Sequence, residues 1–170
     1  IYIYTYVNTI CVYDYICTQC IGGWDVSKVK NMRAMFQFTL DFNGDISSWN
    51  TSNVNDMSFM FNVANDFNQD ISNWDVSNVT NMNYMFQSAV NFDQDISGWD
   101  VSSVTEMSHM FSNAGNFNQD IGDWDVSSVT DMDSLFDEAG EFNGDISGWN
   151  VSSVTEMSHM FQFALDFNQD

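Results

Sequence analysis

The chain repeats one motif, Asp70-Ile71-Ser72-Asn73-Trp74-Asp75-Val76-Ser77-Asn78-Val79-Thr80-Asn81-Met82-Asn83-Tyr84-Met85-Phe86. Its tryptophan returns every 25 residues, at Trp24, Trp49, Trp74, Trp99, Trp124 and Trp149. A fixed period of this length marks an array in which each unit buries its apolar side against its neighbours. We therefore predict six tandem repeats over residues 21–170, forming one domain that is part of a longer array.

The composition limits the classes of partner. Among 170 residues, 24 are acidic and only 3 are basic, so the formal net charge is −21. A field of this sign repels nucleic acid and anionic membranes, and it favours cations or basic partners. Apolar residues make up 44% of the chain, which argues against a disordered acidic tail. No apolar run reaches the roughly 18 residues of a membrane span, so we expect none.

Residues 1–20 depart from the motif. The alternation from Ile1 to Val7 is typical of a strand, yet a shift of 25 residues places several apolar or cysteine side chains on core positions of the next repeat. We interpret 1–20 as a degenerate first repeat or N-terminal cap, and an independent strand is the alternative. Because the chain opens on Ile and stops within a repeat, we expect it to be a piece of a longer protein.

All three cysteines, Cys11, Cys17 and Cys20, lie in this first segment. Cys17 and Cys20 have a CxxC spacing, but the βαβ context of a thioredoxin-like site is absent. A zinc site would need a fourth ligand, and the two histidines lie several repeats away from the cysteines. The interpretation that fits best is that Cys11 and Cys17 fill core positions held by phenylalanine elsewhere. A local disulfide is the alternative, and their redox state stays open.

Within each repeat the apolar spacing suggests two elements. Val54, Met57, Met60, Phe61 and Ala64 are separated by 3, 3, 1 and 3 residues, which predicts a short helix near 54–64 and its equivalents. The spacing before it, as in Ile71, Trp74 and Val76, resembles the LxxLxL pattern of leucine-rich repeats and predicts a short strand. The Met, Trp and Phe positions are expected to stack into the core.

The full motif, Phe-Asn-Gln-Asp-Ile-Ser-x-Trp-Asp-Val-Ser-x-Val-Thr-x-Met-x-x-Met-Phe, resembles the short tandem repeat of bacterial surface proteins and mycoplasma lipoproteins. These repeats are called BspA-like and are grouped with the leucine-rich repeats. The resemblance covers residues 21–170 and implies a non-enzymatic array at the cell surface or outside the cell, often linked to adhesion. The fold expected is an α/β repeat, a curved leucine-rich-repeat-like solenoid with one short strand and one short helix per repeat.

An enzyme is not expected. Catalysis needs unlike groups in a unique cleft, whereas nearly every polar group here is copied 25 residues away. His109 and His159 share a column whose other members are Ala34, Phe59, Tyr84 and Ser134, which is typical of a tolerant surface position. We predict no catalytic residue, no cofactor and no single metal site.

The expected strand face presents a nearly uniform polar surface. Its candidate interaction residues are Asp25, Asn50, Asp75, Asp100, Asp125 and Asn150, with Ser27, Ser52, Ser77, Ser102, Ser127 and Ser152. Such a face suits a protein or polysaccharide surface, a mineral or another copy of the chain, although these groups can also simply satisfy turns. A weak Ca²⁺-binding scaffold is a further alternative, because carboxylates and hydroxyls suit this ion.

The charge distribution suggests a second kind of contact. The only basic residues are Lys28, Lys30 and Arg33, whereas residues 121–145 hold eight acidic side chains. Contact between the basic end of one chain and an uncapped, acidic C-terminal end, including Asp166 and Asp170, would build a homo-oligomer or filament. The alternative function is therefore a structural segment that associates end to end into a filament or stalk.

Overall fold

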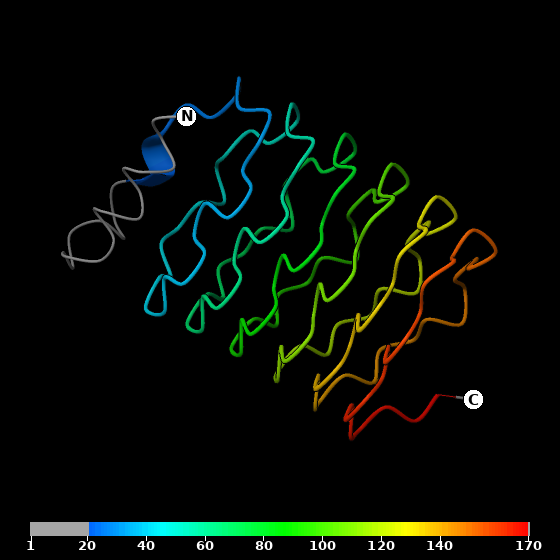
Figure 1. The fold of residues 1–170 in the computed structure, drawn as a ribbon. Helices are drawn as coiled ribbons and strands as arrows, with labels where there is room; N and C mark the ends of the chain where they lie inside the picture. Colours follow the sequence, from blue (N-terminus) through cyan, green and yellow to red (C-terminus); the bar gives the residue numbers. More distant parts are fainter. Residues whose placement is uncertain (1–20, 170) are drawn as a thin grey trace.

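The computed structural model describes residues 21–169, in which successive 25-residue repeats form coils stacked along one axis (Figure 1). Each coil lies directly against the next, so residues 25 positions apart are neighbours. The degenerate repeat or cap predicted over residues 1–20, with its cysteines, lies outside the described residues. No helix in the stretch from 21 to 169 is long and apolar enough to cross a membrane.

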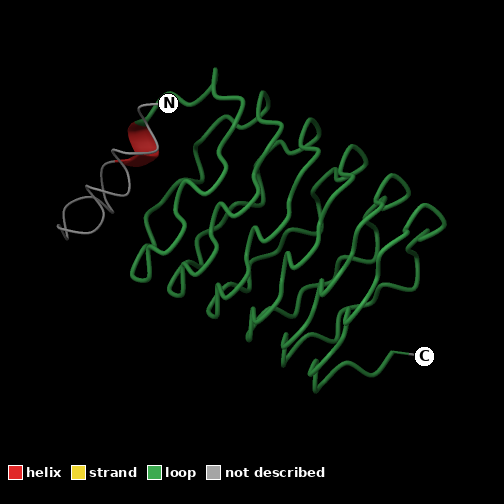
Figure 2. Cartoon of the chain, in the orientation of Figure 1, coloured by secondary structure: helices red, strands yellow, loops and turns green. Residues whose placement is uncertain are grey.

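Regular secondary structure is almost absent from these coils. The described residues contain one 3₁₀ helix, η2 (Ile21–Gly23), and turns and loops form nearly all the rest (Figure 2). Neighbouring coils are joined by isolated parallel bridges, for example between Asn31 and Asp56 and between Asn81 and Glu106. The predicted α/β leucine-rich-repeat fold, with a strand and a helix in every repeat, is therefore wrong.

Consecutive turns replace the predicted helix. In residues 56–64 and their equivalents, which we call the turn ladder, backbone N–H groups alternate between two kinds of partner. Met60 and Ala64 donate to carbonyls three residues earlier, whereas Phe59 and Phe61 donate to carbonyls of the next coil, at 2.9 Å in each case. The apolar spacing of 3 and 4 residues therefore reflects turns that each close over three residues, and half of the hydrogen bonds hold neighbouring coils together.

Two positions in each turn ladder have positive φ although neither is glycine. In the second repeat they are Phe59 and Val63, both with φ of 59°. Bulky and β-branched residues adopt this left-handed conformation only at a cost. A right-handed helix has no such residues, so these two positions distinguish the turn ladder from a helix, and the hydrogen bonds to the next coil offset their cost.

The predicted strand around Trp–Asp–Val is also a pair of turns. The Trp74 amide donates to the Ile71 carbonyl at 3.1 Å, and the Val79 amide donates to the Val76 carbonyl at 2.9 Å. The link to the adjacent coil comes from the indole, since Trp74 Nε1–H donates to the carbonyl of Ile46 at 3.2 Å. Tryptophan thus fills the core and also satisfies a backbone carbonyl of the preceding coil.

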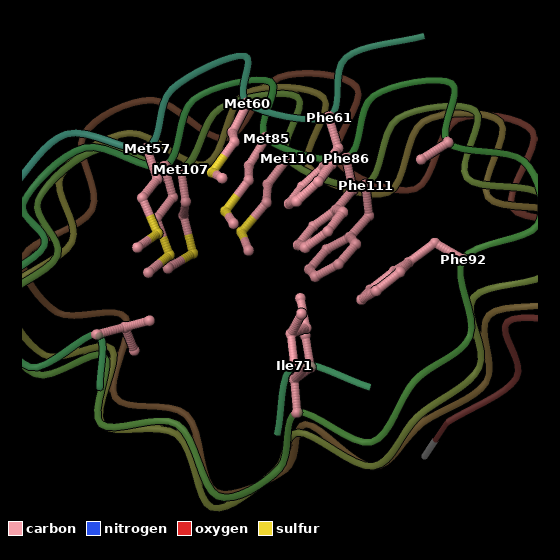
Figure 3. Packing of buried hydrophobic residues seen from close by; sticks show 14 of the residues in the cluster. Met57, Met60, Phe61, Ile71, Met85, Phe86, Phe92, Met107, Met110 and Phe111 are labelled. Carbon is pink, nitrogen blue, oxygen red and sulfur yellow. The ribbon is translucent and has the colours of Figure 1, made fainter. Parts of the chain in front are cut away.

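The core consists of columns of identical side chains that run along the stack. Met57, Met60 and Phe61 point inward from the turn ladder, and Ile71 points inward from the opposite side of the coil (Figure 3). The Phe61 and Phe86 rings stack at 5.6 Å, and the Trp49 and Trp74 rings at 6.4 Å. Packed helices need about 8–10 Å between their axes, so ring columns at this spacing leave no room for a helix in each coil.

Candidate interaction surfaces

The side of the coil that carries Ile71 displays two columns of short polar turns, which we call the aspartate–serine face. At Asp75, the carboxylate Oδ1 accepts the Ser77 hydroxyl at 2.6 Å and the Ser77 amide at 3.1 Å. Asp70 makes the same pair of bonds with Ser72. These aspartates are exposed, and each one immediately precedes a backbone turn, which is Ile71 to Trp74 after Asp70 and Val76 to Val79 after Asp75.

All six predicted aspartate or asparagine positions make this turn, so the predicted residues share one local structure. The amide of the serine two positions later donates to Oδ1 at Asp25, Asn50, Asp75, Asp100, Asp125 and Asn150. A second acidic column, which was not among the predicted interaction residues, repeats the turn at Asp45, Asp70, Asp95, Asp120 and Asp145. Its signal in the sequence was an aspartate in the same place in every repeat.

The turns stabilise the charged form of several of these carboxylates. The Ser77 hydroxyl and then its amide hold the pKa of Asp75 below the ordinary value. Hydrogen bonds from the serine two positions later likewise lower the pKa of Asp25, Asp45, Asp70, Asp95, Asp125 and Asp145. At the aspartates of both columns Oδ1 is used by the turn, and Oδ2 accepts no bond from the described residues.

The described part of the chain contains no cluster of metal-binding side chains. Across residues 21–169, no group of three or more His, Cys, Asp or Glu side chains is arranged to hold a metal ion. Ca²⁺ needs six to eight oxygens. One carboxylate per turn, with one oxygen already used, offers too few.

The outer side of the turn ladder differs in that its side chains vary from coil to coil. It is linked by polar contacts between neighbours, such as Asn31 Nδ2 donating to Asp56 Oδ2 at 2.9 Å and Asn81 Nδ2 donating to Glu106 Oε2 at 2.8 Å. One amide row runs from Gln37 to Asn62 to Gln87. It stops at the short Ser112, and beyond that break Asp137 Oδ1 is buried without a partner among the described residues.

In three successive coils the first positive-φ position carries a ring, and these half-buried rings form a row. The Arg33 guanidinium lies 4.6 Å from the Phe59 ring centre, and the Phe59, Tyr84 and His109 rings follow one another at 4.5 Å. His109 Nε2 then lies 3.3 Å from Asp133 Oδ2. Burial, together with the charges of Asp133 and Asp131, raises the pKa of Tyr84. The histidine column was interpreted from the sequence as a tolerant surface position, and the stacking was not anticipated.

The residues expected to mediate end-to-end contact differ in their exposure and in their contacts. Lys28 and Lys30 are exposed, whereas Arg33 is held by Phe59 and by a 2.8 Å hydrogen bond to Ser58 Oγ. Asp166 is exposed and its amide donates to the Gly140 carbonyl at 3.1 Å. Asp170 lies outside the described residues.

Comparison with known proteins agrees with the tandem organisation. No curated protein and no solved structure matches the chain. A family model does match, and it does so twice, over residues 11–114 and again over 93–170, as expected where a unit shorter than the model is repeated. With these two overlapping matches, the chain is a tandem-repeat protein and belongs to the family described as Mycoplasma protein of unknown function, DUF285.

Proposed function

We propose that the chain is a non-enzymatic, BspA-like module at the cell surface or outside the cell, and that its aspartate–serine face binds a polysaccharide. The observation that carries this proposal is the uniformity of the face. An aspartate or asparagine recurs at the same place in each turn column, and its Oδ1 accepts the amide of the residue two positions later. Fixed acceptors in a regular row suit a polymer whose hydroxyl donors also recur, and they suit an irregular protein epitope less well.

The turns contribute rigidity to this surface. Because Oδ1 of these aspartates is held by one bond, as at Asp125, or by two, as at Asp75 and Asp100, the side chains have little rotamer freedom left to lose when a ligand binds, which lowers the entropic cost of association. Aspartates such as Asp75 and Asp125, whose pKa the serine bonds lower further, offer a charged acceptor, which forms a stronger hydrogen bond with a hydroxyl than a neutral one.

The test is co-sedimentation of the purified chain with insoluble chitin, cellulose and peptidoglycan. The variant Asp75→Asn, Asp100→Asn, Asp125→Asn removes three charges but keeps the turns, because asparagine already occupies the equivalent positions 50 and 150. The control Asp41→Asn, Asp66→Asn, Asp166→Asn removes three charges from another column, where asparagine also occurs naturally. We expect binding that only the first variant loses. Absence of binding to all three polymers, or equal binding by both variants, would contradict the proposal.

A second candidate function is end-to-end self-association, and the uneven distribution of charge favours it. The three basic residues, Lys28, Lys30 and Arg33, lie in repeat 21–45, whereas residues 121–145 hold eight acidic side chains. A contact that joins the basic end of one chain to the acidic end of another uses two different surfaces, so it is head to tail.

Salt-dependent sedimentation of the chain tests this second candidate. Replacing Lys28, Lys30 and Arg33 together should weaken the association if the basic end meets an acidic one, since surface charges are screened within about 8–10 Å at physiological salt. Unchanged sedimentation of the triple variant would exclude this contact.

A further inference from the structure

Two of the described coils carry an asparagine followed by a glycine at the same place in the repeat. These pairs are Asn43-Gly44 and Asn143-Gly144, and the coils between them carry Asn68-Gln69, Asp93-Gln94 and Asn118-Gln119. A backbone nitrogen can attack the side-chain amide of the asparagine before it, and glycine hinders this approach least because it has no Cβ. The two pairs are therefore candidate sites of spontaneous deamidation.

The next coil supplies two donors to the side-chain oxygen of each of these asparagines. Asn43 Oδ1 accepts the backbone N–H of Asn68 and the Nε2–H of Gln69, both at 3.0 Å. The equivalent two donors reach Asn143 Oδ1 at 3.0 and 2.9 Å. Two N–H groups on one carbonyl oxygen stabilise the negative charge that develops there when a nucleophile adds to the carbonyl carbon, as in an oxyanion hole.

The attacking and leaving nitrogens are not held by hydrogen bonds within the described part of the chain. The backbone amides of Gly44 and Gly144 donate to no acceptor among residues 21–169, so no such bond has to break before the nitrogen attacks. Nδ2 of Asn43 and of Asn143 donates to none of these residues either. Both asparagines are exposed, so ammonia can leave directly into water.

We propose that Asn43 and Asn143 are sites of spontaneous modification, which deamidate through a succinimide and which the next coil directs to aspartate. The nitrogen of Gly44 forms a bond to Cγ of Asn43 and gives its proton to Nδ2, and ammonia leaves as the Cγ–Nδ2 bond breaks. Water then adds to Cγ, the bond from Cγ to the glycine nitrogen breaks, and that nitrogen regains a proton. In sum, one water is consumed and one ammonia is released.

The same donors determine which product forms. Water that adds to Cγ of the succinimide restores the ordinary main chain and gives aspartate. Water that adds to the main-chain carbonyl carbon gives isoaspartate, in which the main chain runs through the side chain. Because the donors from Asn68 and Gln69 contact the oxygen on Cγ, they favour addition at Cγ and therefore aspartate.

The column already contains an aspartate that makes these contacts. Asp93 Oδ1 accepts the backbone N–H of Asn118 at 3.0 Å and the Nε2–H of Gln119 at 2.6 Å. An aspartate formed from Asn43 would keep both of its bonds, and its charge would strengthen them. These positions lie outside the residues of the proposed polysaccharide site, so the inference does not rest on that function.

Peptide mapping of the folded chain after incubation at about pH 8 tests the two sites. We expect conversion at Asn43 and Asn143 while Asn68 and Asn118 stay intact, and we expect Gly44→Gln to abolish conversion at Asn43 only. Glutamine occupies this place in the neighbouring coils, so the variant should keep the fold. An intact folded chain, after a time in which the urea-unfolded chain converts, would overturn the proposal.

The ratio of aspartate to isoaspartate tests the role of the donors. An isoaspartate-specific methyltransferase labels one product, and we expect a higher ratio in the folded chain than in urea. Gln69→Ala removes one donor from Asn43 and should lower the ratio at that site. The matched control Gln94→Ala removes the equivalent donor from Asn68 and should leave the ratio at Asn43 unchanged. Equal ratios in the folded and unfolded chains, or equal effects of the two variants, would contradict direction by the next coil.

Discussion

Single residues on the turn ladder decide how well one coil connects to the next. Gln37 Nε2 donates to Asn62 Oδ1 at 2.8 Å, and Asn62 Nδ2 donates to Gln87 Oε1 at 2.7 Å, so each amide satisfies its neighbour. Ser112 is too short to continue the row, and Asp137 Oδ1 is left buried without a donor from the described residues. A buried acceptor without a partner costs stability, so this position is a local weakness.

Extending the side chain at this position should remove the weakness. In Ser112→Gln, the new amide should reach Asp137 as Gln37 reaches Asn62, and the free energy of unfolding should rise by about 1 kcal/mol. Urea unfolding measures the change. Ser112→Ala is the control, because it removes the hydroxyl without supplying a donor and should bring no gain. A loss of stability in the glutamine variant would contradict this account of the row.

At the scale of elements, the apolar periodicity identified the core side chains but not the backbone. Val54, Met57, Met60, Phe61 and Ala64 are all fully buried, at 0% exposure, as their spacing predicted. That spacing fits a helix and also fits consecutive turns with bonds to the residue three positions earlier. The two conformations differ in the φ of Phe59 and its equivalents. The aromatic, histidine and serine side chains at these positions do not indicate a positive φ in the sequence.

The serine turns of the aspartate–serine face should contribute to stability in a pH-dependent way. Ser77→Ala removes the hydroxyl bond to Asp75, and we expect a loss of about 0.5 kcal/mol at pH 6. The folded pKa of Asp75 lies below the ordinary 3.8, so this contribution is present above that pH and is lost as the pH falls through the folded value. Thermal unfolding at pH 6 and pH 3 should show a smaller difference between variant and wild type at the lower pH.

The matched control for this experiment is Ser128→Ala. Ser128 is exposed in the same region of the coil, and no side-chain hydrogen bond of its hydroxyl is found in the described residues. Its replacement should change the unfolding temperature little at either pH. A pH-independent deficit in Ser77→Ala would mean that the hydroxyl acts through packing and not through the carboxylate.

At the scale of the whole molecule, the 25-residue period could be predicted because the same residue types recur at a fixed spacing. The columns of the aspartate–serine face could be predicted from that period. The aromatic row from Arg33 to His109 could not be predicted, because its members are chemically different and only the register of the coils brings them together. The same register explains why the fold is stable without helices. Each coil is held by columns of side chains and hydrogen bonds that continue into the neighbouring coils.

A stack held by nearest neighbours should respond differently to damage in the middle and at the end. Trp99 is 4% exposed and packs between coils on both sides, so Trp99→Ala should cost about 3–5 kcal/mol. Trp149 is half-buried in the last described coil, and Trp149→Ala should cost less, because that coil has one described neighbour. Urea unfolding measures both losses, and equal values would indicate a single undivided core.

The central claim is that the amides of the turn ladder bind the next coil and not their own chain four residues back. Nuclear magnetic resonance detects couplings that pass through a hydrogen bond, from an amide nitrogen to the carbonyl carbon that accepts it. The structure predicts couplings from Phe59 to Asn83 and from Phe61 to Met85, across bonds of 2.9 Å. Couplings from Phe59 to Asn55 and from Phe61 to Met57 would show a helix, and they would contradict the fold described here.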